Sequence, residues 1–63
     1  SDVEAVQFKH WKEAYEYDKN NKILGRKWQQ ALYALGVQFN FSSHNCKLAL
    51  EALKKLREEG FEY

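Results

Sequence analysis

Basic side chains are the first candidates for chemistry in this sequence. Lys19, Lys22, Arg26 and Lys27 lie within nine residues, with no acidic residue among them. If Gly25 precedes a helix, Arg26 and Lys27 occupy its first turn, where backbone N–H groups and the helix dipole attract anions. Both cations are unfavourable for the helix itself, because a first turn prefers acidic residues. The stretch is therefore a candidate site for a phosphate or carboxylate group, although solvated cations of this kind can also simply offset acidic residues elsewhere.

The histidines and the cysteine do not form a metal-binding or catalytic pattern. His44 and Cys46 are two residues apart, so on a helix they diverge by about 200° and cannot share an ion. His10 is the other histidine, and Cys46 is the only cysteine. A chain of 63 residues also leaves little room for a concave pocket with a nucleophile and its base. We therefore expect no catalytic residue, no metal ion and no cofactor.

A second candidate surface follows residue 42, where polar residues would open a helix. Such a helix start resembles the base-reading end of a helix-turn-helix recognition helix. Glu51 would repel a phosphate backbone, and the segment from Gly36 to Ser43 exceeds the three or four residues of the tight motif. The residues that a nucleic-acid interface would use are Arg26, Lys27, Ser43, His44, Asn45, Lys47 and Lys54.

Two stretches, RKWQQALYALG and SSHNCKLALEALKKL, resemble the second and third helices of a Myb/SANT repeat. In that family a Trp opens the second helix and a Cys falls just inside the third. Trp28 and Cys46 would occupy these places, with Ala31 and Leu32 following the Trp. The resemblance implies a DNA-binding helix pair. Leu50 stands where the family has a further Trp, so no functional residue is carried over. WQQALYAL is also similar to part of the second helix of an FF domain, without the aspartate–proline turn of that family.

Aromatic residues make up 16% of the chain, so a small core built on some of them can suffice, but not all of them are expected to be buried. Tyr17 lies off the apolar stripe of the first expected helix, as does Val6. Phe41, Phe61 and Tyr63 are hard to bury at the same time. Exposed aromatic residues are enriched in protein interfaces, although they can also close the two ends of a helical bundle.

Apolar residues recur at helical spacing in three segments, and no alternating run is long enough to predict a strand. We predict an all-α fold, a small three-helix domain with helices at about 3–19, 25–36 and 43–59. The expected core contains Trp11, Trp28, Leu32, Leu50 and Leu53. The clearest apolar stripe consists of Leu24, Trp28, Ala31, Leu32, Leu35 and Phe39.

The helix ends have recognisable signals. Residues 20–21 are both Asn, which tolerates left-handed backbone and can end the first helix. Gly36 is either the C′ glycine that ends the second helix or an interior glycine of a helix that continues toward Phe39, and we favour an end near Gly36. Ser42 or Ser43 can cap the third helix. Residues 60–61 are Gly and Phe, which is typical of a Schellman ending.

Composition indicates a single folded domain over 1–63, expected to be part of a larger protein. The net charge is +1, but residues 19–47 carry five basic residues and no acidic one. Glu58 and Glu59 lie at the negative end of the third helix dipole, which folding does not explain. No apolar run is long enough to span a bilayer. The single cysteine favours a reducing, intracellular compartment, cytoplasmic or nuclear, and a monomer is favoured over an oligomer.

The function that these features favour is a non-catalytic protein-interaction module. It would bind an acidic or phosphorylated segment of a partner protein, because Arg and aromatic residues provide most interface anchors. The residues expected to contact the partner are Lys22, Arg26, Lys27, Tyr17 and Phe41. DNA binding through the second and third helices is the alternative. An oligomerising structural module is a third possibility, and it requires Val6, Tyr17 and Leu48 to form one exposed patch.

Overall fold

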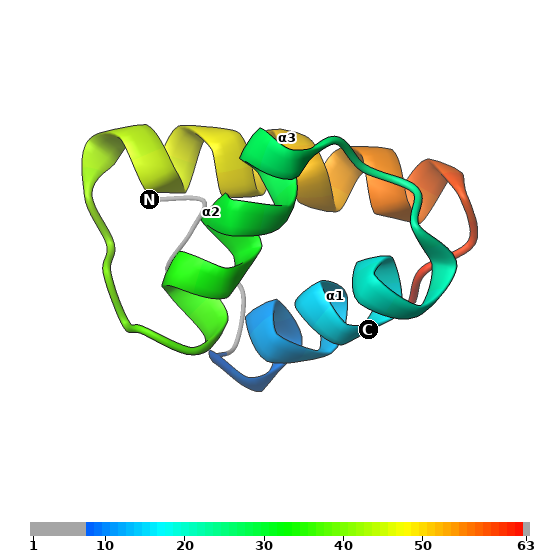
Figure 1. Cartoon of the computed structure of the whole chain (residues 1–63), viewed down its shortest axis with the longest axis horizontal. Coiled ribbons are helices and arrows are strands. Elements are labelled where there is room, and N and C mark those ends of the chain that lie inside the picture. The colour runs from blue at the N-terminus through cyan, green and yellow to red at the C-terminus, as the bar shows by residue number, and fades with distance from the viewer. Residues whose placement is uncertain (1–7, 63) are drawn as a thin grey trace.

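The structure is a computed structural model, and it describes residues 8–62, which contain three α-helices. They are α1 (Phe8–Asn21), α2 (Arg26–Gly36) and α3 (Ser43–Glu58). α2 crosses between α1 and α3 and packs against both, whereas α1 and α3 barely contact each other (Figure 1). The predicted all-α, three-helix fold is confirmed, and the predicted helix start near residue 3 lies outside the described residues. None of the helices within 8–62 is long and apolar enough to cross a membrane.

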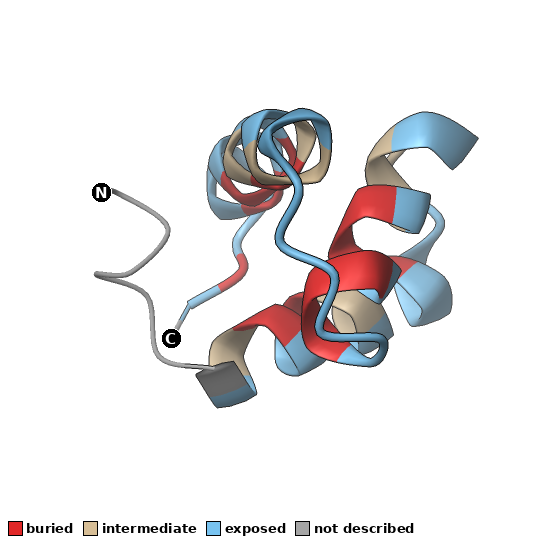
Figure 2. Ribbon diagram, turned by 90° about the vertical axis from the view of Figure 1, so that its left-hand side faces the viewer, coloured by how far each residue is buried: buried red, intermediate tan, exposed pale blue. Residues whose placement is uncertain are grey.

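The core lies where the three helices face one another, and the connector 37–42 is exposed (Figure 2). Trp11, Leu32 and Leu53 are buried as predicted. Trp28 and Leu50 are only half-buried, because they lie at the margins of the helix contacts. The buried apolar residues are Trp11, Ala14, Ala31, Leu32, Ala34, Leu35, Ala49, Ala52, Leu53, Leu56 and Phe61.

Asp18 is fully buried in the last turns of α1, and its carboxylate joins three segments. Oδ1 accepts hydrogen bonds from the backbone N–H of Ile23 (3.1 Å) and of Leu24 (2.7 Å). Oδ2 accepts a hydrogen bond from Nε2 of Gln29 in α2 (3.0 Å). A buried carboxylate is tolerated only when its oxygens have partners. These bonds fix the connector 22–25 and the start of α2 to the end of α1.

At the end of α1, the residue with left-handed backbone is not one of the two predicted asparagines. Lys22 has a φ of 52°, and its N–H donates to the carbonyl oxygen of Asp18 (2.6 Å). Asn21 remains in the helix and donates from Nδ2 to the carbonyl oxygen of Tyr17 (2.7 Å). The asparagine therefore stabilises the last turn through its side chain, and the backbone reversal falls on the lysine that follows.

Gly36 ends α2 as predicted, but for a different physical reason. It does not have a positive φ. A Cβ atom at this position would lie 2.7 Å from the backbone N of Lys12 and 2.8 Å from the carbonyl carbon of Trp11. α2 therefore makes its closest approach to α1 here, and only a residue without a side chain fits.

Both ends of α3 follow the predicted signals. Ser42 is the N-cap, and its Oγ accepts a hydrogen bond from the N–H of Asn45 (3.2 Å). Gly60 has a φ of 106°, and the N–H of Phe61 donates to the carbonyl oxygen of Leu56 (3.0 Å), which is the Schellman pattern. Phe61 is buried with its ring 5.2 Å from that of Tyr17, so the segment after α3 closes the space between α1 and α3.

Removing the Asp18 carboxylate should destabilise the fold strongly. In Asp18→Ala, the N–H groups of Ile23 and Leu24 lose their acceptor, and we expect the free energy of unfolding to fall by about 2–4 kcal/mol. Asp18→Asn should lose much less, because its amide can still accept from the backbone and can donate to Gln29. Urea unfolding followed by circular dichroism tests this. Equal stabilities of the two variants would contradict the role given to the carboxylate.

Gly36→Ala should destabilise the protein although alanine is the better helix former. The added methyl group meets backbone atoms of α1 that cannot move aside, and overpacking of this kind costs about 1–3 kcal/mol. Gly25→Ala is the matched control, because its Cβ would lie 3.5 Å from the ring of Trp28, an ordinary contact. Thermal unfolding of both variants measures the difference. A Gly36→Ala variant as stable as the unmodified protein would show that the helices do not approach so closely.

Lys22→Gly should stabilise the protein, because glycine adopts a positive φ without steric cost. We expect a gain of about 0.5–1 kcal/mol in the free energy of unfolding. Lys22→Ala removes the same charge but keeps a Cβ atom, so it should give no such gain. Comparing the two variants in urea separates the backbone effect from the charge effect. Stabilisation of the same size in both would assign the effect to charge instead.

Candidate functional site

Trp28 is the centre of a small cluster of charged side chains from α2 and α3. Its ring is half-buried in the first turn of α2. The ammonium nitrogen of Lys27 lies 4.5 Å from the ring centroid, and that of Lys55, on α3, lies 4.8 Å from it. Glu51 Oε1 accepts a hydrogen bond from the indole Nε1 (3.2 Å). We call Lys27, Trp28, Glu51 and Lys55 the Trp28 cluster.

The Trp28 cluster brings positive charges together. Because both ammonium groups lie close to the same ring, they are within one Debye length of each other. The Debye length is about 10 Å at 0.1 M salt. Within residues 8–62, neither lysine forms an ion pair with a carboxylate, nor does Arg26 beside them. α2 also has Gly25 as its N-cap, without a side-chain cap, and no acidic residue in its first turn. The region therefore attracts anions.

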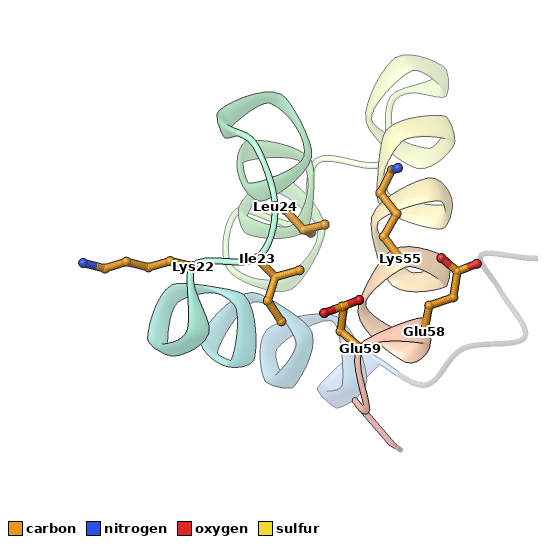
Figure 3. A pocket seen from close by; sticks show the side chains of 6 residues that line it. All are labelled: Lys22, Ile23, Leu24, Lys55, Glu58 and Glu59. Atoms are coloured by element: carbon orange, nitrogen blue, oxygen red, sulfur yellow. The ribbon is translucent and has the colours of Figure 1, made fainter.

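A groove of about 510 Å³ lies next to the Trp28 cluster, between the connector 22–25 and the last turns of α3. Ile23 and Leu24 are half-buried, and their side chains point toward α3, whereas Lys22 points away from the groove (Figure 3). Glu59 points across the groove toward Ile23. The groove thus has an apolar wall on the connector and a charged wall on α3. Its lining residues are Lys22, Ile23, Leu24, Lys55, Glu58 and Glu59.

The predicted partner-binding residues are divided between different parts of the molecule. Lys22, Arg26 and Lys27 are exposed around the start of α2. Tyr17 is half-buried, packs on Phe61 and donates from its hydroxyl to the carbonyl oxygen of Glu59 (3.2 Å), so it contributes to the fold. Phe41 is exposed, but it lies in the connector beyond the opposite end of α2.

Sequence reasoning did not find the contribution of Lys55, nor that Trp28 is the aromatic residue beside the cations. Trp28 was assigned to the core because it belongs to the apolar stripe of α2. Lys55 joins the Trp28 cluster only through the packing of α3 on α2. The spacing of Glu51 and Lys55, one helical turn apart, was the available signal that the two side chains share a face of α3.

The residues predicted for nucleic-acid contact are distributed over the start of α2 and both halves of α3. Ser43, His44 and Lys47 are exposed at the start of α3, and Lys54 is exposed near its end. Asn45 is half-buried and donates from Nδ2 to the carbonyl oxygen of Asn40 (3.2 Å), which holds the connector 37–42. Arg26 and Lys27 lie in the first turn of α2. That turn contacts the later half of α3 through Trp28, which bonds Glu51 and lies under Lys55.

Exposed large hydrophobic residues occur in the last turn of α2 and in the connector 37–42. Tyr33, Val37, Phe39 and Phe41 are its exposed large hydrophobic residues, and Phe39 has a left-handed backbone with a φ of 58°. Of the patch that an oligomerising module would require, Tyr17 and Leu48 are half-buried against the core. Val6, its third member, lies outside the described residues.

Metal-binding geometry does not occur within residues 8–62, where no three His, Cys, Asp or Glu side chains converge. The thiol of Cys46 instead lies 3.5 Å from the carbonyl oxygen of Phe41, to which it donates.

Comparisons of the chain with protein-family models, with curated proteins and with solved structures found no match.

Proposed function

We propose that this domain is a non-catalytic protein-interaction module that binds an acidic or phosphorylated segment of a partner protein at the Trp28 cluster. The observation that carries this proposal is the convergence of Lys27 and Lys55 on one half-buried indole ring. These two exposed like charges repel each other weakly through solvent, and neither has an ion-pair partner within residues 8–62. An incoming carboxylate or phosphate would relieve this repulsion.

The indole ring gives the same place an apolar contact surface. Trp, Tyr and Arg are enriched among the residues that contribute most of the binding energy in protein interfaces. Trp28 is held by the packing of α2 on α3 and by its hydrogen bond to Glu51, so little conformational freedom is lost on binding. Arg26 lies in the same turn and can form a bidentate contact with a carboxylate or phosphate.

The proposal predicts that acidic peptides perturb Trp28 and that this depends on the two lysines. The probes are synthetic peptides that contain either three glutamates or one phosphoserine between glycines and serines, and the readout is the indole N–H signal of Trp28 in NMR spectra, assigned with Trp28→Phe. Lys27→Gln combined with Lys55→Gln should weaken binding roughly fivefold or more. Lys9→Gln removes one charge at an exposed position of α1 that is not part of the Trp28 cluster, and it should leave the affinity unchanged.

The outcomes separate this proposal from nucleic-acid binding. Binding of acidic peptides should weaken as salt is added, because the charges are exposed. A DNA duplex titrated at two salt concentrations provides the comparison. The proposal fails if the Trp28 signal does not move with any acidic or phosphorylated peptide. Tight DNA binding that depends on Lys47 would replace it with the nucleic-acid alternative.

A further inference from the structure

We infer that the groove beside the Trp28 cluster selects a partner segment in which an apolar residue lies between an acidic and a basic residue. This inference rests on the proposed function, since it places the acidic residue at Lys55. It adds two requirements: an apolar side chain that packs on Ile23 and Leu24, and a cation that faces Glu59. The partner is therefore a short extended protein segment of mixed charge.

The size and rigidity of the groove support a bound side chain. Its volume of about 510 Å³ lies in the range of small-ligand sites, roughly 300–1,000 Å³. The backbone N–H groups of Ile23 and Leu24 are held by the buried carboxylate of Asp18. The apolar wall is consequently formed before any partner arrives, which lowers the entropic cost of binding.

The charges on the opposite wall give the groove a direction. Lys55 lies at the end nearer to Trp28, and Glu58 and Glu59 follow at the end of α3 (Figure 3). Within residues 8–62, neither glutamate has an ion-pair partner. Both are unfavourable for α3, because carboxylates at a helix C-terminus oppose its dipole. A basic residue of the partner would supply the missing counter-charge.

The spacing on α3 sets the spacing in the partner. Glu59 is the C-cap of α3, four residues after Lys55, and residues at this spacing on a helix have about 5–6 Å between their Cβ atoms. An extended segment advances about 3.3 Å per residue, so residues two apart match this distance. Alternate side chains of such a segment point to opposite sides. In Glu-Leu-Lys, or in the reverse order Lys-Leu-Glu, the two charges would therefore face α3 while the leucine faces the connector.

Ile23 provides a specific reporter for this groove, because it is the only isoleucine in the chain. Its δ1 methyl signal in NMR spectra is therefore unique, and it reports on the groove independently of the indole signal of Trp28. The probes are acetylated nine-residue peptides of glycine and serine with a central Glu-Leu-Lys, Lys-Leu-Glu, Glu-Ala-Lys or Glu-Leu-Glu. We expect one of the two orders of Glu, Leu and Lys to shift both signals, with higher affinity than the alanine and the all-acidic peptides.

Charge reversal tests the direction of the groove. Glu59→Lys should reverse the preference, so that Glu-Leu-Glu binds about two- to fivefold more tightly than Glu-Leu-Lys. The substitution replaces an anion by a cation at a helix C-terminus, so the fold should be preserved, which circular dichroism checks. Glu16→Lys is the matched control, because it makes the same charge change at an exposed position of α1 that does not line the groove. It should leave the preference for Glu-Leu-Lys over Glu-Leu-Glu intact.

Each remaining outcome decides between the two proposals. If acidic peptides shift the Trp28 signal while the Ile23 methyl signal stays unchanged and Glu59→Lys alters nothing, the groove inference is overturned and the proposed function stands. If the Ile23 signal moves alone, the acidic residue is not at Lys55, and both proposals fail in their present form. If neither signal moves, both are overturned.

Discussion

The buried carboxylate of Asp18 is the interaction on which the rest of the structure depends. Its two oxygens accept hydrogen bonds from the connector 22–25 and from Gln29 of α2. Without the carboxylate, the backbone N–H groups of Ile23 and Leu24 would lose their acceptor in this turn. The same bonds position Ile23 and Leu24 along the groove and set where α2 begins. Asp18 therefore determines the geometry of the candidate site without lining the groove.

Small residues explain how three short helices form a core around α2. Gly36 lets α2 meet the backbone of α1, and buried alanines occupy contacts on all three helices. Close approach of this kind leaves space for few large side chains. Part of the apolar burial is therefore supplied from outside the helices, by Phe61, which packs on Tyr17. Small residues that line the helix contacts are Ala14, Ala31, Ala34, Gly36, Ala49 and Ala52.

Sequence patterns predicted the helices well, because apolar periodicity and capping signals are local. The ends at Gly36, Ser42 and Gly60 were found correctly, yet the reason for Gly36 was not, since a close approach between helices leaves no mark in local sequence. Asp18 was missed for the same reason: in an acidic segment a carboxylate looks solvated, and its burial depends on where α2 turns back. The stripe of α2 was extended too far, to Phe39, which is 64% exposed in the connector.

Only part of the candidate site could be predicted from the sequence. The predicted part consists of charged residues that are unfavourable for the dipole of their own helix. Arg26 and Lys27 stand at the positive end of α2, and Glu58 and Glu59 stand at the negative end of α3. Each pair is unfavourable for its own helix. Packing brings Lys27 and Lys55 together at the ring of Trp28, and Lys55, Glu58 and Glu59 line the adjacent groove. Within residues 8–62, Arg26, Lys27, Glu58 and Glu59 have no ion-pair partner, so neither helix compensates its unfavourable charges, and the proposed site is our account of this local inconsistency.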